Sequence, residues 1–113
     1  MVESDGTRRD VTREMLERNG FDVLVAADGR RALELGRDHD GAIDLLLTDV
    51  VMPEMSGLEL ADAVKARHPE TLVVYKTAYA KEVFGDGPRP VALMEKPFDE
   101  AQLLEVLGRH LPG

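Results

Sequence analysis

The sequence predicts an α/β domain in which a parallel sheet carries helices on both faces. Short apolar runs alternate along the chain with segments whose apolar residues recur at helical spacing, and strands separated by helices in this way pair in parallel. The length of 113 residues suits one domain, 1–113, which should bury roughly two-thirds of its unfolded surface. A hydrophobic content of 43% without any low-complexity tract favours a compact domain over disorder.

The composition also disfavours several classes of protein. Cysteine is absent, which excludes a disulfide scaffold or a cysteine zinc site and is compatible with a reducing compartment. The longest apolar stretches have five or six residues, far fewer than the roughly 20 that cross a bilayer. With no leader at its start, the chain is expected to be cytoplasmic and to have no membrane partner. A net charge of -8 repels a phosphate backbone and disfavours nucleic-acid binding.

The first half of the chain predicts two helices and two strands. Segment 7–19 has its apolar residues on one helical stripe, and Asn19-Gly20 is a stop signal. Segment 21–26 alternates between apolar and polar residues, as a strand does. Asp28 can cap a second helix that runs to about residue 38. Segment 45–49 is apolar until Thr48-Asp49, which predicts a strand buried on both faces.

The second half continues the alternation. Ser56 can cap a third helix, which His68-Pro69 ends. The β-rich run 72–75 predicts a fourth strand, and 91–94 predicts a shorter fifth one. Asp99 and Gln102 form a capping pair for a last helix.

Two regions depart from a regular alternation. Only Met1 and Val2 precede Glu3, so the first strand is almost missing. Residues 85–90 contain two glycines and two prolines, which preclude a regular helix there. Any fourth helix therefore has one or two turns at most.

Polar residues gather where the predicted strands end. They are Glu3, Ser4 and Asp5 after the first strand, Asp49 after the third, Thr77 after the fourth and Lys96 after the fifth. In open parallel sheets, ligands bind beyond the carboxyl ends of the strands. Carboxylates there supply oxygen ligands for Mg²⁺, while a lysine and a hydroxyl hold phosphoryl oxygens. Such a site suits in-line phosphoryl transfer to a carboxylate.

The segment around Asp49 resembles the phosphoacceptor loop of response regulator receiver domains. It reads Thr48-Asp49-Val50-Val51-Met52-Pro53-Glu54-Met55-Ser56-Gly57, where the family has Asp, then Met-Pro-x-Met-Ser/Asp-Gly. Asn19-Gly20-Phe21 and Lys96-Pro97-Phe98 also match, so the resemblance covers nearly the whole chain. Segment 77–80 and the short link to 94–98 are most similar to receivers of hybrid sensor histidine kinases. The resemblance implies a flavodoxin-like, doubly wound sheet of strand order 2-1-3-4-5.

The resemblance also assigns roles to residues. It implies that Asp49 is the acceptor, that Thr77 supplies the hydroxyl that follows the phosphoryl group, and that Lys96 is the cation that pairs with it. Mg²⁺ would be held by Glu3, Asp49 and the carbonyl of Val51. The Lys96-Pro97 bond is expected to be cis.

A two-component phosphorelay is the function that follows from the resemblance. The expected partner is a histidine kinase or a histidine phosphotransfer protein. The domain would be no enzyme beyond self-phosphorylation and self-dephosphorylation, unless it is part of a longer histidine kinase. Val51 and Tyr79 should border the phosphoryl group, and because neither orients water well, we expect slow self-dephosphorylation.

Three departures from the family pattern carry consequences. The acidic pair falls on Glu3 and Ser4, and since the second acid normally ligates the metal, Mg²⁺ affinity should be weakened. The first strand is internal in order 2-1-3-4-5, so its truncation leaves neighbours unpaired, and a second copy in a homodimer could complete it. Leu93 stands where most members carry an aromatic ring, which favours signalling by loop ordering.

Two other functions remain open from the sequence. A pseudo-receiver would keep the fold and act as a phosphorylation-independent interaction module, as Ser4 and the short first strand favour. A small phosphotransferase or phosphatase could use Asp49 as nucleophile, but haloacid-dehalogenase-type enzymes need a second Asp where this chain has Val51.

Overall fold

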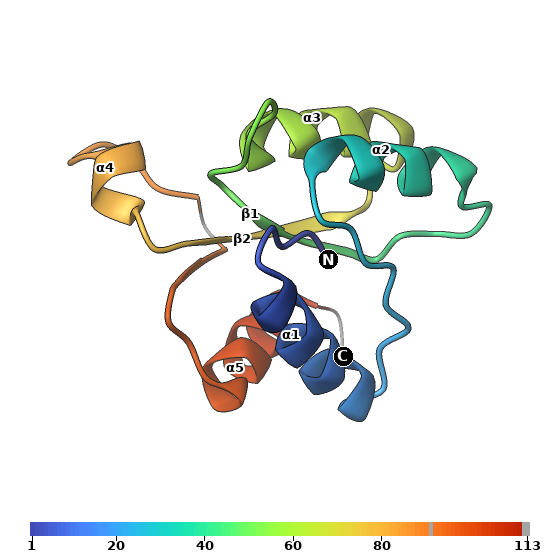
Figure 1. Cartoon of the computed structure of the whole chain (residues 1–113), viewed down its shortest axis with the longest axis horizontal. Helices are drawn as coiled ribbons and strands as arrows, with labels where there is room; N and C mark the ends of the chain where they lie inside the picture. Colours follow the sequence, from blue (N-terminus) through green and yellow to red (C-terminus); the bar gives the residue numbers. More distant parts are fainter. Residues whose placement is uncertain (91, 112–113) are drawn as a thin grey trace.

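The computed structural model describes residues 1–90 and 92–111 and confirms the α/β class. Three parallel strands form a sheet of order β1-β2-β3, with helices on either side (Figure 1). The elements in chain order are α1 (Gly6–Arg18), α2 (Gly29–Asp38), β1 (Leu45–Asp49), α3 (Gly57–Arg67), β2 (Leu72–Thr77), α4 (Ala80–Phe84), β3 (Leu93–Glu95) and α5 (Glu100–His110).

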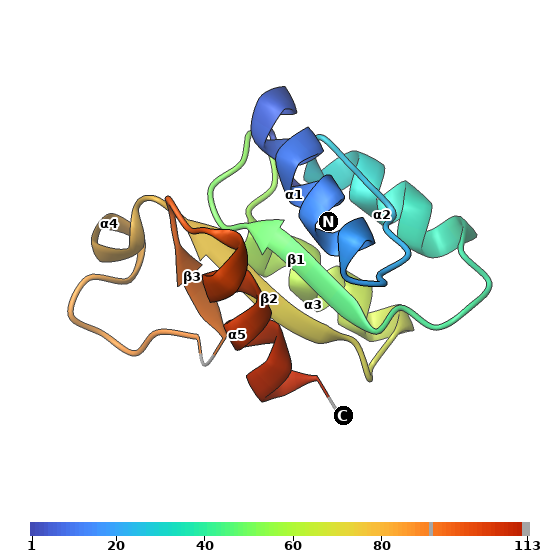
Figure 2. The ribbon, with the colours of Figure 1, turned by 90° about the horizontal axis from the view of Figure 1, so that it is seen from below.

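The helices cover the sheet in two layers, each with its own apolar core. Helices α1 and α5 lie on one face and α2 and α3 on the other, as the two ribbon views agree (Figures 1 and 2). On the first face, Leu47 and Val74 pack against Leu16, Leu103 and Leu107. The buried residues of the second face are Val2, Ala26, Leu46, Leu60, Ala61 and Val64. Because β1 contributes to both cores, its two faces are buried, as its apolar sequence predicted.

Side-chain caps fix the starts of α2, α3 and α5, as the sequence predicted. The carboxylate of Asp28 accepts the amide of Arg31 at the start of α2. Ser56 and Glu59 form a reciprocal capping box at the start of α3, and Asp99 and Gln102 form another at α5. The fourth helix, α4, has five residues, which confirms the expected limit of one or two turns.

The first strand consists of little more than Val2. This residue forms isolated parallel bridges to Ala26 on one side and to Thr48 on the other, an arrangement consistent with order 2-1-3-4-5. The prediction of a regular strand over 21–26 is wrong, because within that segment only Ala26 is bridged. Its neighbour in the sheet offers too few residues to continue a ladder.

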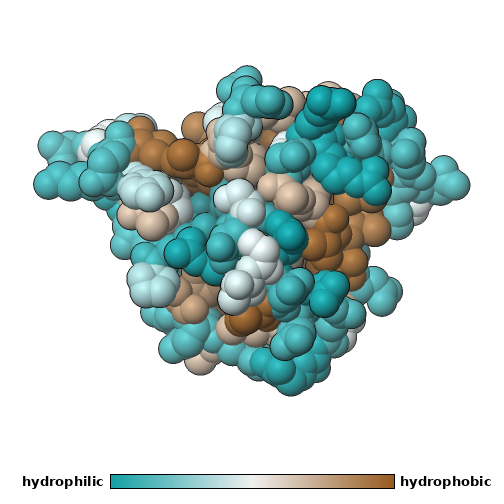
Figure 3. Space-filling view, in the orientation of Figure 1, coloured by the Kyte–Doolittle hydropathy of each residue, from teal (hydrophilic) through white to brown (hydrophobic). Residues whose placement is uncertain are grey.

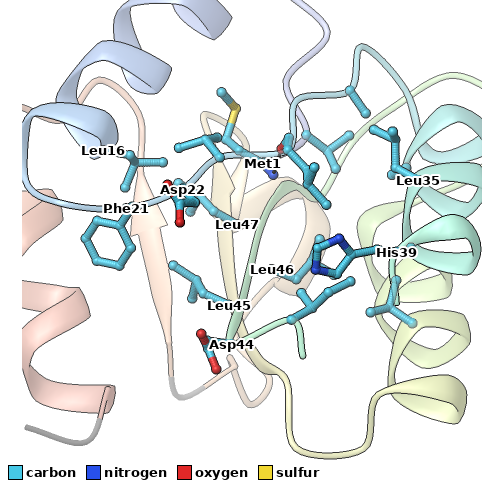
Figure 4. A pocket seen from close by; sticks show the side chains of 18 of the residues that line it. Met1, Leu16, Phe21, Asp22, Leu35, His39, Asp44, Leu45, Leu46 and Leu47 are labelled. Carbon is cyan, nitrogen blue, oxygen red and sulfur yellow. Dashed lines mark hydrogen bonds between the residues drawn. The ribbon is translucent and has the colours of Figure 1, made fainter. Parts of the chain in front are cut away.

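A cavity of about 450 Å³ lies where the first strand is short. It is bounded by segment 20–24, the end of α2 and β1, and Figure 4 shows Phe21, Leu45 and His39 around it. Apolar surface is visible on this side of the molecule beside the N-terminus (Figure 3). The cavity lies toward the amino end of β1, away from Asp49 at its carboxyl end, and is not the predicted site.

Two further predictions concern the end of the sheet. The fifth strand runs over Leu93–Glu95, while Val91, where it was predicted to begin, lies outside the described residues. The Lys96-Pro97 bond is cis, as expected. Within the described ranges, no helix combines the length and the apolar character needed to cross a membrane.

Replacing Leu103 by Ala should lower the free energy of unfolding by about 2–5 kcal/mol, since its fully buried side chain joins α5 to the sheet. Leu58 is the matched control, because it lies in α3 with 38% of its surface exposed, and its replacement by Ala should change stability by about 0.5 kcal/mol or less. Urea unfolding followed by circular dichroism measures both. Equal losses in the two variants would contradict the assignment of the core.

Candidate functional site

The register of the strands places three charged residues in one row. Asp49 of β1 is paired with Lys76 of β2. Val2 is bridged to Thr48, so Glu3 lies beside Asp49 in the same row. In adjacent parallel strands, side chains at paired positions point to the same side of the sheet. Residues far apart in the sequence therefore meet at the carboxyl ends of the strands.

Two carboxylates and two ammonium groups are in direct contact at this point. The Nζ of Lys76 lies 2.8 Å from Glu3 Oε1 and 2.8 Å from Asp49 Oδ1. The Nζ of Lys96 lies 3.0 Å from Glu3 Oε1 and 2.6 Å from Asp49 Oδ1. We call Glu3, Asp49, Lys76 and Lys96 the four-charge cluster. Its formal charges cancel.

Backbone amides hold the remaining carboxylate oxygens. The amide of Ser4 donates to Asp49 Oδ2 at 3.3 Å, and the amide of Asp5 donates to Glu3 Oε2 at 3.1 Å. Burial raises the pKa of Glu3, but hydrogen bonds from Lys76 and from the Asp5 amide outweigh it and hold this pKa at about 2. Glu3 is therefore ionised at neutral pH because donors surround its carboxylate.

Lys76 is the most deeply buried member of the cluster, with none of its side chain exposed, whereas Lys96 keeps 13%. A buried ammonium must be paired, because removing one partner of a buried ion pair costs about 3–5 kcal/mol. Glu3 and Asp49 meet that requirement for Lys76. The buried ion pairs of Lys76 thus connect β2 to β1 and to the residue that follows the first strand.

The loop after Asp49 depends on Gly57. A Cβ at Gly57 would lie 2.1 Å from the carbonyl oxygen of Asp49, closer than any side chain allows. The amide of Gly57 donates to the carbonyl of Val50 at 2.8 Å, so the loop folds back onto the strand end. Glu54, with φ of 68°, makes the turn. These features fix where α3 begins relative to Asp49.

Thr77 and Val51 lie beside the cluster without joining its ion pairs. The buried hydroxyl of Thr77 accepts the amide of Tyr79 at 3.0 Å, and its carbonyl accepts the amide of Lys96 at 2.9 Å. Val51, two residues beyond Asp49, is 51% exposed. Ser4 contributes its amide to the site. Of the predicted residues, the structure brings together Glu3, Asp49 and Lys96.

Sequence reasoning missed Lys76, although a signal was present. The predicted fourth strand stopped at Tyr75, whereas β2 continues through Lys76 to Thr77. The run Leu72-Val73-Val74-Tyr75-Lys76-Thr77 is otherwise without charge, as a central strand buried on both faces should be. Lysine is almost never fully buried unless it is paired. A lysine near the end of such a strand therefore indicates carboxylates on the neighbouring strands.

Comparison with known proteins identifies the family. A family model described as "Response regulator receiver domain" matches residues 1–108. This chain belongs to the response regulator receiver family. The α/β fold and the predicted resemblance are thereby confirmed.

Three relatives show how far the similarity of this receiver extends. It is 36% identical over 107 residues to the transcriptional regulatory protein CpxR of Escherichia coli K12, covering 92% of this chain but 44% of CpxR. It is 32% identical over 114 residues to the response regulator receiver protein CpdR of Brucella abortus, covering 98% and 93%. The solved receiver domain of the hybrid histidine kinase CckA superimposes with a TM-score of 0.83 at 32% identity, covering 98% and 95%. The chain thus spans less than half of CpxR.

Receiver domains generally bind Mg²⁺ for phosphorylation, but this cluster fits a divalent cation poorly. Within residues 1–90 and 92–111, no three His, Cys, Asp or Glu side chains are grouped so that they could hold a metal. The two carboxylates that are present already bind ammonium groups. The metal ligand set of Glu3, Asp49 and Val51 stays a prediction, and the contacts of Lys76 disfavour it.

The lowered pKa of Glu3 predicts a specific loss of stability in acid. Because its pKa is about 2 in the folded chain against an ordinary value of 4.5, its contribution is complete above pH 4.5 and is lost as the pH falls toward 2. The loss is on the order of 3 kcal/mol. Denaturant unfolding from pH 6 to pH 2 should show a flatter pH dependence for Glu3→Gln than for the unaltered protein. Parallel curves would contradict the pairing of Glu3.

Proposed function

We propose that this receiver accepts a phosphoryl group on Asp49 from the phosphohistidine of a histidine kinase or a histidine phosphotransfer protein. The observation that carries the proposal is the contact of one Asp49 oxygen with two ammonium groups, at 2.6 and 2.8 Å. Fixed positive charge at the acceptor attracts a phosphoryl donor and stabilises the charge that develops in transfer. A surface aspartate without such neighbours has neither property.

The transfer needs no redox step. A carboxylate oxygen of Asp49 attacks phosphorus, and a bond between that oxygen and phosphorus forms. The bond from phosphorus to the histidine nitrogen breaks, and its electron pair stays on the imidazole, which takes a proton from solvent. Lys96, the more exposed of the two lysines, can follow the incoming phosphoryl oxygens.

Thr77 is proposed to bind a further oxygen of the phosphoryl group. Its hydroxyl now accepts the amide of Tyr79, and its own proton is a donor for phosphate. Turning toward Asp49 would release the Tyr79 amide at the start of α4. Helix α4 has only five residues, and the chain then passes through a loop with two glycines and two prolines. We therefore propose that phosphorylation changes the order of this loop.

The compartment, the activity and the binding partners of the domain belong to the same proposal. We expect it to act in the cytoplasm as a phosphoacceptor rather than an enzyme, with self-phosphorylation and self-dephosphorylation at most. The net charge of -8 disfavours direct nucleic-acid binding. A homodimer through the short first strand stays a prediction.

A pseudo-receiver is the second candidate, and the contacts of Lys76 favour it. A lysine fully buried between Glu3 and Asp49 would serve equally as a permanent structural tie. In that role it would hold a fixed surface for a protein partner without phosphorylation. The two functions differ in whether Asp49 reacts.

Acetyl phosphate with Mg²⁺ should add one phosphoryl group to the full chain, detected by intact-mass spectrometry. Asp49→Asn should add none, because the amide is no nucleophile for phosphorus. Asp86→Asn, which changes an exposed aspartate after α4, is the control and should react as the unaltered chain does. No reaction in the unaltered chain would favour the pseudo-receiver, and a reaction that persists in Asp49→Asn would place the acceptor elsewhere.

Self-dephosphorylation should be slow and should quicken several-fold in Tyr79→Ala. The exposed ring of Tyr79 follows Thr77 by two residues and should limit the approach of water to the phosphoryl group. Decay of the phosphorylated mass after removal of acetyl phosphate measures the rate. Val83→Ala, an exposed position on α4, is the control. Faster decay of the phosphorylated mass in the unaltered chain than in Tyr79→Ala would contradict the prediction that Tyr79 limits the access of water.

A further inference from the structure

The buried ammonium of Lys76 has a use beyond tying strands together. We propose that Lys76 supplies the positive charge that phosphoryl transfer to Asp49 requires, so that this receiver is phosphorylated without a divalent cation. The inference rests on the proposed function, since it concerns the same acceptor. It assigns to a residue of β2 the role that a bound metal would otherwise have.

The position of Lys76 is suited to this role. Lys76 is directly opposite Asp49 in the ladder of β1 and β2, so its backbone is fixed by the sheet. Its Nζ contacts Asp49 Oδ1 and Glu3 Oε1 at 2.8 Å each. With none of its side chain exposed, the ammonium cannot exchange these partners for water. The charge is therefore preorganised at the acceptor.

The charges of the cluster remain small through the reaction. Before transfer, Glu3 and Asp49 cancel Lys76 and Lys96. After transfer, Glu3 and a phosphoryl group of about two negative charges face two ammonium groups, which leaves about one net negative charge. No additional cation is needed to make the phosphorylated state tolerable. A divalent ion would instead bring two positive charges beside two ammonium groups.

A metal would also have to displace Lys76. Glu3 Oε1 and Asp49 Oδ1 are each held by both lysines, and amides hold the second oxygen of each carboxylate. An ion that took Glu3 and Asp49 as ligands would leave the ammonium of Lys76 buried without a partner, which is strongly unfavourable. Lys76 lies in the central strand and is fully buried, so its ammonium is not in contact with solvent that could replace these partners. The geometry thus favours ammonium over metal at these oxygens.

The test compares acetyl phosphate labelling of the full chain in Mg²⁺ with labelling in EDTA. Here the carboxylate oxygen of Asp49 displaces acetate from phosphorus, and the electron pair leaves with acetate. Intact-mass spectrometry gives the initial rate. We expect rates in the two conditions that agree within about twofold. Labelling in Mg²⁺ but not in EDTA would overturn the inference and leave the proposed function standing, whereas no labelling in either condition would overturn both.

Two variants test whether labelling without a divalent cation depends on Lys76. Lys76→Met should lose at least about tenfold in rate in EDTA, and Ser4→Asp combined with Lys76→Met should recover labelling only when Mg²⁺ is present. Lys65→Met, an exposed lysine of α3, is the matched control and should behave as the unaltered chain. Circular dichroism establishes which variants fold. If Lys76→Met does not fold, the comparison of the unaltered chain in Mg²⁺ and in EDTA still tests the inference. If Lys76→Met folds and is labelled in EDTA at an unchanged rate, the inference is overturned.

Discussion

The pairing of two buried carboxylates with two lysines is the interaction on which this molecule depends. It joins residues from the start of the chain, from β1, from β2 and from the loop after β3. Each charge alone would be costly at such depth, and together they are stable only in this geometry. The same contacts that hold the strand ends in register also surround Asp49, the phosphoryl acceptor that we propose. Stability and the proposed function therefore depend on one set of atoms.

Local rules predicted most of the architecture. Caps at Asp28, Ser56 and Asp99 gave the helix starts, and the Gly/Pro-rich segment 85–90 gave the short α4. Segment 21–26 failed as a strand because its pairing depends on a neighbour elsewhere in the chain. Alternation of apolar and polar residues is a property of one segment, whereas a ladder of backbone hydrogen bonds requires two paired strands. The sequence showed that only Met1 and Val2 precede Glu3, but the alternation within 21–26 does not reflect how short that partner is.

The site was predicted in part for a related reason. Glu3, Asp49 and Lys96 were found because a family motif and the strand-end rule mark them. Lys76 lies within β2, so neither the family motif nor the strand-end rule marks it. Its contact with Asp49 follows from the register of β1 and β2. Register is a property of pairs of strands, so the identity of the carboxylates that Lys76 contacts depends on the pairing of β1 with β2. The sequence alone could have shown only that Lys76 is paired with some acidic group. A charged residue in an apolar strand is the pattern that would have revealed it.

The contact at Gly57 joins the strand end that carries Asp49 to α3 without any intervening side chain. The backbone of the first turn of α3 lies directly against the carbonyl of Asp49, at a distance that excludes even a methyl group. Side chains can change rotamer and absorb a small shift, but two touching backbones cannot. The Asp49 peptide and the first turn of α3 therefore keep a separation that a side chain at residue 57 would enlarge. Residue 57 is therefore restricted to glycine by the strand end that carries Asp49 and not by the helix that it begins.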